Sequence, residues 1–119
     1  MEEIRKINFQ ELNQNELKKL LDRALQFGSR EDLEALFDQG MDINQGDFSD
    51  RTALMMAAST GKKEVVLMLL ERSADVNKVC MYQGRIPLTA LDAAREKNKT
   101  EIVNILLEHG AKTGKELTP

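Results

Sequence analysis

Apolar and polar positions follow one pattern twice in the second half of the chain. In each copy a Thr-Ala-Leu triplet comes first, an alanine follows, and a Glu-Val-Val or Glu-Ile-Val triplet precedes a pair of leucines. The glutamate stands twelve positions after the threonine in both copies, so the two superpose without a gap. The copies are Thr52, Ala53, Leu54, Ala57, Glu64, Val65, Val66, Leu69 and Leu70, then Thr89, Ala90, Leu91, Ala94, Glu101, Ile102, Val103, Leu106 and Leu107. Such a repeat indicates stacked supersecondary units.

Each copy predicts two short helices, the first rich in small residues and the second carrying a broader apolar stripe. The helical spacing is visible at Leu54, Ala57 and Ala58, and then at Val65, Val66, Leu69 and Leu70. Turn-rich stretches at 42–51 and 75–88 join the helix pairs, and we expect them to protrude as hairpin-like fingers. A third, more diverged copy lies upstream in the same register, at 21–44. The chain is therefore about three units long.

Helix-start and helix-stop residues agree with this division. Four pairs stand at the spacing of a capping box: Asn13 with Glu16, Ser29 with Asp32, Thr89 with Asp92, and Asn98 with Glu101. Glycines fall where helices should end, at Gly28, Gly40, Gly61 and Gly110. Asn98 and Ser73 replace glycine at two such places. Asparagine tolerates the left-handed conformation, whereas we expect Ser73 to strain its turn by about 1 kcal/mol.

In this arrangement the residues resemble the ankyrin repeat family, whose unit is a β-turn followed by two helices. The likeness is nearly position for position over 44–64, where Asp47 opens the finger and Thr52-Ala53-Leu54 stands where the family has Thr-Pro-Leu. It covers roughly 15–113. The resemblance implies an all-α ankyrin-repeat solenoid of helix-turn-helix pairs with protruding β-hairpin-like fingers.

Several positions depart from the family pattern. The finger glycine is Asp50 in the middle unit, and the histidine that usually follows Thr-Pro-Leu is Met55 in one unit and Asp92 in the next. The last finger carries four extra residues around 81–87. These departures leave open how the helix-start hydrogen bonds of both units are made.

We expect the units to divide the chain at fixed points. Residues 1–12 form an N-terminal extension, 13–44 the first repeat, 45–77 the second, 78–113 the third with its extended finger, and 114–119 a tail. Each unit buries its apolar face only against a neighbour, so the first and last repeats must act as caps. The polar segment from residue 112 onward is expected to fray.

Composition and charge limit the classes of partner that we expect. The net charge of −3 gives no general attraction to phosphate backbones, so nucleic acid is not expected as a partner. Cys80 is the single cysteine, which excludes an internal disulfide. The start of the chain lacks an apolar stretch of signal-peptide length, and the apolar runs are too short to cross a bilayer. We expect a cytoplasmic, soluble monomer that does not bind a membrane.

Catalytic chemistry finds little support in the sequence. His109, the only histidine, precedes Gly110 at a predicted helix end, where the helix dipole suits it. Cys80 and His109 could form a nucleophile pair only with a third, orienting group, and none is evident. The acidic residues lack calcium-loop spacing. We therefore expect no enzyme, no metal and no cofactor.

The resemblance implies a binding surface made of finger tips and the exposed side of the first helices. In the last finger, apolar and aromatic residues accompany an arginine, a combination typical of interface hot spots. The alternative is that this finger, 78–88, folds back and buries them. The candidate partner-binding residues are Phe48, Ser49, Arg51, Ser59, Thr60, Met81, Tyr82, Arg85, Glu96 and Lys97.

The function implied is a non-enzymatic protein-protein interaction module that binds a protein partner through its concave finger and groove surface. A narrower alternative is an immunity- or inhibitor-type protein that blocks a toxin or an enzyme. The two differ in the identity of the partner, which the sequence does not specify.

Overall fold

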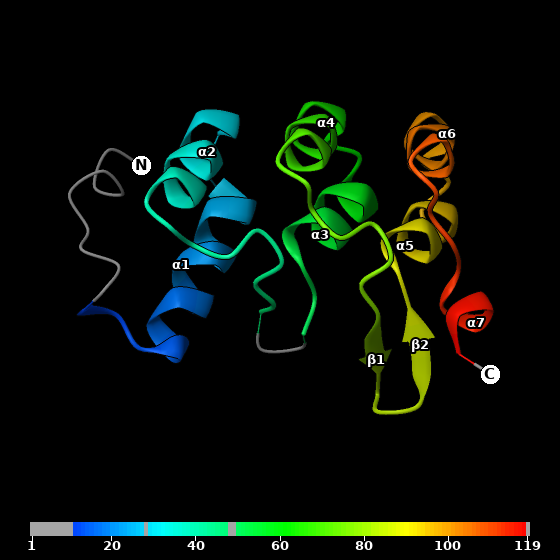
Figure 1. Ribbon diagram of the computed structural model, residues 1–119, viewed down its shortest axis with the longest axis horizontal. Coiled ribbons are helices and arrows are strands. Elements are labelled where there is room, and N and C mark those ends of the chain that lie inside the picture. Colours follow the sequence, from blue (N-terminus) through cyan, green and yellow to red (C-terminus); the bar gives the residue numbers. More distant parts are fainter. Residues whose placement is uncertain (1–10, 28, 48–49, 119) are drawn as a thin grey trace.

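The computed structural model describes residues 11–27, 29–47 and 50–118, with only the backbone at Tyr82. Three helix pairs follow one another: α1 (Gln14–Phe27) with α2 (Arg30–Asp38), α3 (Ala53–Thr60) with α4 (Lys63–Glu71), and α5 (Ala90–Glu96) with α6 (Thr100–Glu108). A hairpin of β1 (Cys80–Tyr82) and β2 (Ile86–Leu88) precedes the third pair, and α7 (Gly114–Leu117) follows it. Figure 1 shows α1, α3 and α5 in one layer and α2, α4 and α6 in a second. The predicted solenoid of helix pairs with fingers is confirmed.

The core consists of rows of equivalent residues, one from each repeat. Nine side chains at three repeat positions are no more than 2% exposed: Leu21, Leu54 and Leu91; Ala24, Ala57 and Ala94; Leu36, Leu69 and Leu106. The alanines bring the first helices close together, and the leucines fill the space between the layers. A fully buried leucine stabilises the fold by roughly 1.5–3 kcal/mol, so these rows hold neighbouring repeats together.

Helix starts agree with the sequence at three of the four predicted capping boxes. Asn13 and Glu16 exchange backbone-to-side-chain hydrogen bonds, and Ser29 and Thr89 close capping boxes with the aspartates three residues on. The predicted box at Asn98 is wrong, because α6 is preceded by Lys99, which makes no side-chain cap bond. Asn98 has a φ of 56° and belongs to the left-handed turn before the cap.

Both helix starts that depart from the family pattern still form hydrogen bonds through their threonines. The Thr52 hydroxyl oxygen accepts from the backbone N–H of Met55 at 3.3 Å. This bond needs only the backbone amide of Met55, so it does not require the family's histidine side chain. The Thr89 hydroxyl donates to the carbonyl of Lys112 at 2.7 Å. Asp92 accepts from the backbone N–H of Gly114 at 2.7 Å, so it ties the start of α5 to α7.

The fingers differ in length and regularity. A bridge between Gly46 and Thr52 closes the described part of the middle finger, and Asp50 in place of the family glycine has a φ of 63°. The last finger is an antiparallel hairpin in which Cys80 pairs with Leu88 and Tyr82 with Ile86. The extra residues therefore build regular strands.

The segment after the third pair is not frayed, contrary to expectation. Thr113 and Glu116 form a capping box at the start of α7, and Gly114 is buried against β2. A Cβ at Gly114 would lie 2.0 Å from the carbonyl oxygen of Pro87, so only glycine allows this approach. The short helix covers the outer side of the last finger (Figure 1).

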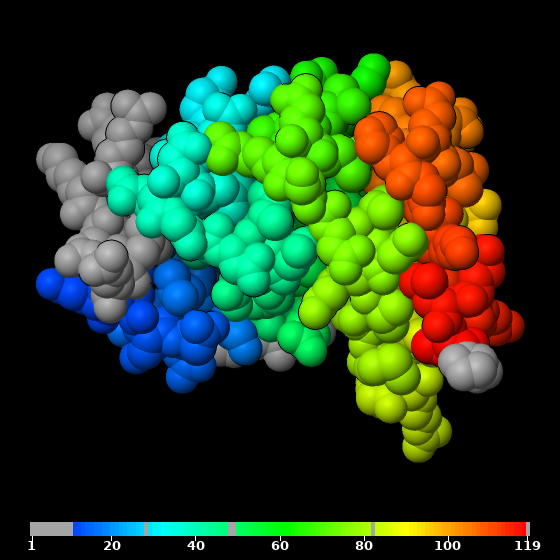
Figure 2. Space-filling view, in the orientation of Figure 1, coloured from blue at the N-terminus to red at the C-terminus, as the bar shows by residue number. Residues whose placement is uncertain are grey.

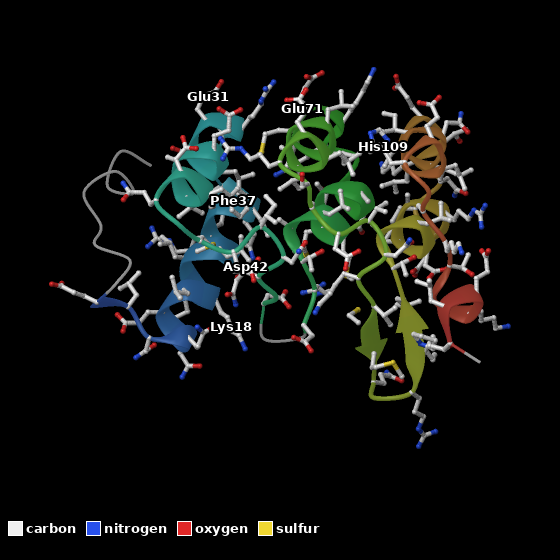
Figure 3. All side chains as sticks on the ribbon, in the orientation of Figure 1. Lys18, Glu31, Phe37, Asp42, Glu71 and His109 are labelled. Carbon is white, nitrogen blue, oxygen red and sulfur yellow. The ribbon has the colours of Figure 1, made fainter. Side chains whose placement is uncertain are left out.

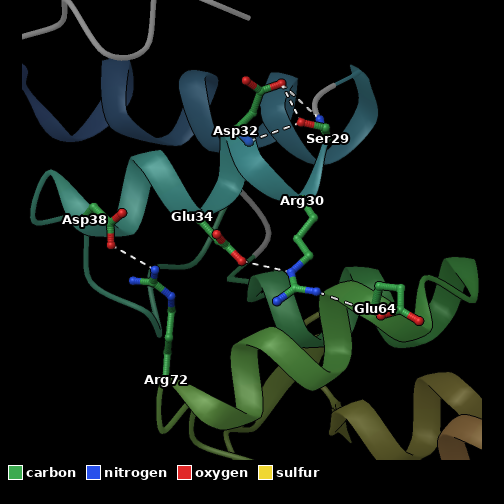
Figure 4. A network of polar contacts seen from close by, with 7 residues as sticks. All are labelled: Ser29, Arg30, Asp32, Glu34, Asp38, Glu64 and Arg72. Carbon is green, nitrogen blue, oxygen red and sulfur yellow. Dashed lines mark hydrogen bonds and ion pairs between the residues drawn. The ribbon is translucent and has the colours of Figure 1, made fainter.

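Polar contacts link successive repeats on two sides. The Asn44 side chain accepts from the Asp75 backbone N–H at 2.7 Å, and Asn77 accepts from that of Lys112 at 2.8 Å. On the second-helix layer, Arg72 forms an ion pair with Asp38, and Arg30 with both Glu34 and Glu64, as drawn in Figure 4. These ion pairs are partly exposed, so each contributes little to stability.

Candidate functional site

A groove runs between α3, α5 and the last finger. Its volume is about 610 Å³. It is lined by Arg51, Met55, Met56, Ser59, Thr60, Cys80, Ile86, Leu88, Thr89, Ala93, Glu96 and Lys97. The first helices supply one wall because their small residues leave space, and the hairpin supplies the other because its extra residues extend it past the helix start.

The floor of the groove is apolar. Met55 and Cys80 are 5% and 6% exposed, and Met56, Leu88 and Ala93 are half-buried. Ile86 is 49% exposed on the finger wall. Methionine side chains are flexible and polarisable, so such a floor can fit partner side chains of different shapes.

The rim of the groove is polar and carries both signs of charge. Arg51 forms an ion pair with the buried Asp47 at 3.0 Å, and its backbone N–H donates to the same carboxylate. Glu96 and Lys97 are exposed at the end of α5. An apolar floor inside a polar rim is the usual anatomy of a protein interface.

The hollow continues toward the first repeat. A second cavity of about 270 Å³ is lined by Leu25, Gln26, Met56, Ala57, Thr60 and Lys62. It shares Met56 and Thr60 with the larger groove. The Lys62 ammonium donates to the carbonyl of Leu25 at 2.6 Å and so closes the end of α1. Two neighbouring hollows therefore lie along the three first helices.

The predicted partner-binding residues fall into three groups. The groove brings five together: Arg51, Ser59, Thr60, Glu96 and Lys97. Met81, 48% exposed, and Arg85, also exposed, lie on the finger outside the groove lining. Phe48 and Ser49 lie outside the described residues, as does the side chain of Tyr82. Whether these residues bind a partner stays a prediction.

Sequence reasoning missed most of the groove floor. Met55 is buried and Met56 is half-buried, yet both line the groove, and neither is among the predicted partner-binding residues. Ile86 is 49% exposed, so the last finger does not fold back over it. The sequence feature that could have indicated the groove is the small residue Ala93 next to the extended finger, because a small side chain leaves space there.

The two residues with catalytic potential are not arranged for it. Burial raises the pKa of the Cys80 thiol, an effect that Asp47 and Asp50 increase and Arg51 opposes. Figure 3 places His109 at α6, in the layer away from the β1–β2 hairpin, and its Nδ1 lies 2.9 Å from the carbonyl of Ile105, to which it donates. Within residues 11–27, 29–47 and 50–118, no three metal-binding side chains gather. Among those same residues, none of the helices has the length and apolar character to span a bilayer.

Comparison with known proteins gives the family. The model described as "Ankyrin repeats (3 copies)" matches residues 21–116. The chain is 41% identical over 83 residues to a B-cell lymphoma 3 protein homolog of Mus musculus, and 42% over 85 residues to serine/threonine-protein kinase 12 of Arabidopsis thaliana. These alignments cover 66% and 71% of this chain and 18% of either relative, so it spans less than a fifth of their length.

A longer alignment leads to the same group. Over 98 residues, or 82% of the chain, it is 36% identical to the ankyrin repeat and KH domain-containing protein mask-1 of Caenorhabditis elegans, of which it covers 4%. Ankyrin repeats are non-catalytic modules that generally mediate protein-protein interaction. Because the family match extends over most of the chain and coincides with the three helix pairs, this protein belongs to the ankyrin-repeat family.

Proposed function

We propose that this chain is a non-enzymatic binding module that docks a protein partner on its concave surface, between the fingers and the first helices. The observation that carries the proposal is the groove of about 610 Å³ between α3, α5 and the last finger. Its apolar floor would take up side chains of the partner, and its polar rim would orient them.

The extent of the hollow favours a protein over a small molecule. The groove and the second cavity share Met56 and Thr60, so the concave surface continues from α5 back to Leu25. A partner segment lying along it would contact three repeats at once. A small ligand would use only one of the hollows and would leave the rest of the apolar floor uncovered.

The chemistry of the groove supports a non-enzymatic role. Cys80, whose thiol lines the groove, has a raised pKa and is therefore mostly thiol at neutral pH. His109 lies on a different element and its Nδ1–H is engaged by the Ile105 carbonyl. General base catalysis requires the base within hydrogen-bond reach of the nucleophile.

The test is a variant that fills the groove. Ala93 lies half-buried on α5 in the groove lining, so Ala93→Arg places a long charged side chain over the apolar floor. The matched control is Asn104→Arg, which adds the same side chain at an exposed position of α6. Both variants and the wild-type chain are used to capture partners from an extract of the source cells, and the captured protein is then titrated in purified form.

We expect Ala93→Arg to weaken binding of the captured partner at least tenfold, the scale of an interface hot spot, and Asn104→Arg to leave it unchanged. Circular dichroism checks that both variants keep their helices. Equal binding by both variants would overturn the groove as the site. A toxin or an enzyme as the partner would turn the general binding role into the narrower inhibitory one.

A further inference from the structure

The last finger differs in charge from the rest of the chain. Residues 78–88 contain Lys78 and Arg85 and no acidic residue, whereas the whole chain has a net charge of −3. Both cations are exposed, and neither forms an ion pair within the described part of the chain. The finger is therefore a local positive charge on a chain that is acidic overall.

The same finger presents apolar side chains on both of its faces. Met81 pairs with Pro87, and Ile86 pairs with Tyr82 one position farther along the hairpin. Because side chains alternate between the faces of a strand, Met81 and Ile86 belong to opposite faces. They are 48% and 49% exposed, so a partner that contacts only one side of the finger would leave one of them in water.

Helix α7 packs against the finger and holds it in its protruding position. Figure 2 shows it extending beyond the rest of the described surface. The backbone of β2 at Pro87 lies against Gly114 of α7, which in turn donates to Asp92 at the start of α5. A hairpin that is already ordered loses little conformational entropy when it enters a partner.

Two acidic groups near the finger, Asp47 and Glu116, are engaged with other partners. Asp47 is paired with Arg51 in the middle finger, near the base of the hairpin. Glu116 of α7 interacts with Arg95 and Lys112 and holds a lowered pKa, chiefly through the backbone N–H of Thr113. The positive charge of Arg85, in the turn of the hairpin, is left for a partner.

From these observations we infer that the last finger inserts into a cleft of a partner protein that has apolar walls and a carboxylate at its base. The walls would cover Met81 and Ile86, and the carboxylate would pair with Arg85. This inference rests on the proposed function and adds the chemistry of the partner. A polyanion such as nucleic acid is disfavoured because only two cations stand on the finger and the acidic remainder of the chain would repel phosphates.

The first experiment maps the contact in the full-length chain. A photo-crosslinking amino acid, benzoylphenylalanine, replaces Met81 on the finger, Lys97 on the groove rim, or Leu107, which is 45% exposed on α6 and serves as the control. Each chain is irradiated in an extract of the source cells, and mass spectrometry identifies the crosslinked peptides. We expect the Met81 probe to label a partner segment rich in apolar residues with Asp or Glu among them, and the Leu107 probe to label nothing comparable.

The second experiment tests the charge pair with the identified partner. Arg85→Glu should weaken binding at least about tenfold, and the loss should shrink as salt rises because charge pairing is screened. Lys115→Glu makes the same change of charge at an exposed position of α7 and should have little effect. Replacing the crosslinked carboxylate of the partner by lysine should restore binding to the Arg85→Glu chain.

The outcomes separate this inference from the proposed function. Labelling from Lys97 but not from Met81, or an Arg85→Glu chain that binds as the wild type does, would overturn the acidic cleft and leave the groove standing. Labelling of nucleic acid or lipid from Met81 would also overturn it. If neither the finger nor the groove probe labels a protein, both ideas fail.

Discussion

Single residues in left-handed backbone mark where the repeat is imperfect. Ser73 has a φ of 65°, at the position that Gly40 and Gly110 occupy in the other two repeats. Asn98 has a φ of 56° where Gly61 stands in the preceding repeat. The left-handed conformation is higher in energy for a residue with a Cβ, and the cost is greater for serine than for asparagine. The strain expected at Ser73 from the sequence thus has its geometric basis.

We predict that Ser73→Gly stabilises the protein. The left-handed conformation costs a residue with a Cβ about 1–2 kcal/mol, and the greater freedom of glycine in the unfolded chain takes back part of that gain. The net increase in the free energy of unfolding should be about 0.5–1 kcal/mol. Urea unfolding followed by circular dichroism measures it.

The matched comparison is Asn98→Gly, which should gain less because asparagine already tolerates the conformation. If Ser73→Gly lowers the unfolding free energy, or if the two variants gain equally, the turn at Ser73 is not strained in the way we describe.

At the scale of whole elements, the helices are started by short side chains that bond back to the backbone. Helices α2, α5 and α7 each begin with a complete capping box. Helices α4 and α6 begin without a side-chain cap bond and follow the left-handed turns at Gly61 and Asn98 instead. The second helices of the later repeats therefore depend on the preceding turn more than on a cap.

We predict that acid weakens the capped helix starts. The backbone N–H of Ser29 lowers the pKa of Asp32, and the backbone N–H of Thr113 lowers the pKa of Glu116. A carboxyl with a lowered folded-state pKa stabilises the fold above its ordinary pKa and loses that contribution as pH falls through the lowered value. The ordinary values are 3.8 and 4.5, so stability should fall below this range.

The measurement is the urea midpoint of the wild type, Asp32→Asn and Glu116→Gln from neutral pH to below 3.8. Each amide variant should be less stable at neutral pH and should approach the wild type at the acid end. Exposed Glu31→Gln serves as the control. Parallel curves for all four proteins would contradict the role of the two carboxylates.

The docking of α7 depends on the absence of a side chain at Gly114. A Cβ there would overlap the carbonyl oxygen of Pro87, so Gly114→Ala should push α7 away from β2. We expect the backbone amide of Thr118, which donates to Gly114, to lose its protection from hydrogen exchange. Overpacking of this kind costs about 1–3 kcal/mol, here mostly as local detachment. Lys115→Ala, at an exposed site, should retain protection; equal protection in both variants would contradict the contact.

Across the whole molecule, the structural features that recur in each repeat were predictable from the sequence, and those that occur only once were not. The helix pairs, their register and the position of the fingers follow from residues such as Leu54 and Leu91, whose spacing recurs and whose burial recurs with it. The helix α7 could not be foreseen, because its docking depends on a contact between Gly114 and a strand that only the longer finger creates.

The candidate groove shows the same division. Two residues of its polar rim, Arg51 and Lys97, were candidates because the resemblance implies a binding surface at the finger tips and the exposed side of the first helices, and both line the groove. Its floor was not, since spacing places Met55 and Met56 on a helix face but does not reveal that the small residue Ala93 of the neighbouring helix lines the same groove. The depth of the groove depends on which side chains from neighbouring repeats line it together, and the pattern within one repeat does not determine this.

Asparagines at equivalent positions add hydrogen bonds between successive repeats. Asn44 makes one bond to the next repeat, to the amide of Asp75. Asn77 makes two, because it also donates to the carbonyl of Gly110 at 3.2 Å. The bonded residues lie 31 and 35 positions apart, and the difference of four matches the extra residues of the last finger. The insertion is thus absorbed by the hairpin without disturbing the stack.

We predict that Asn77→Ala uncouples the third repeat. Each lost hydrogen bond should cost about 1 kcal/mol, so Asn77→Ala should lower stability by about 2 kcal/mol and Asn44→Ala by about half of that. In a stack held by nearest-neighbour contacts, a weaker interface lets the end repeat open separately. Hydrogen exchange should therefore rise in α5 and α6 before it rises in α3. The exposed Asn104→Ala is the control, and uniform exchange across all three repeats would show that the leucine and alanine rows alone keep the stack cooperative.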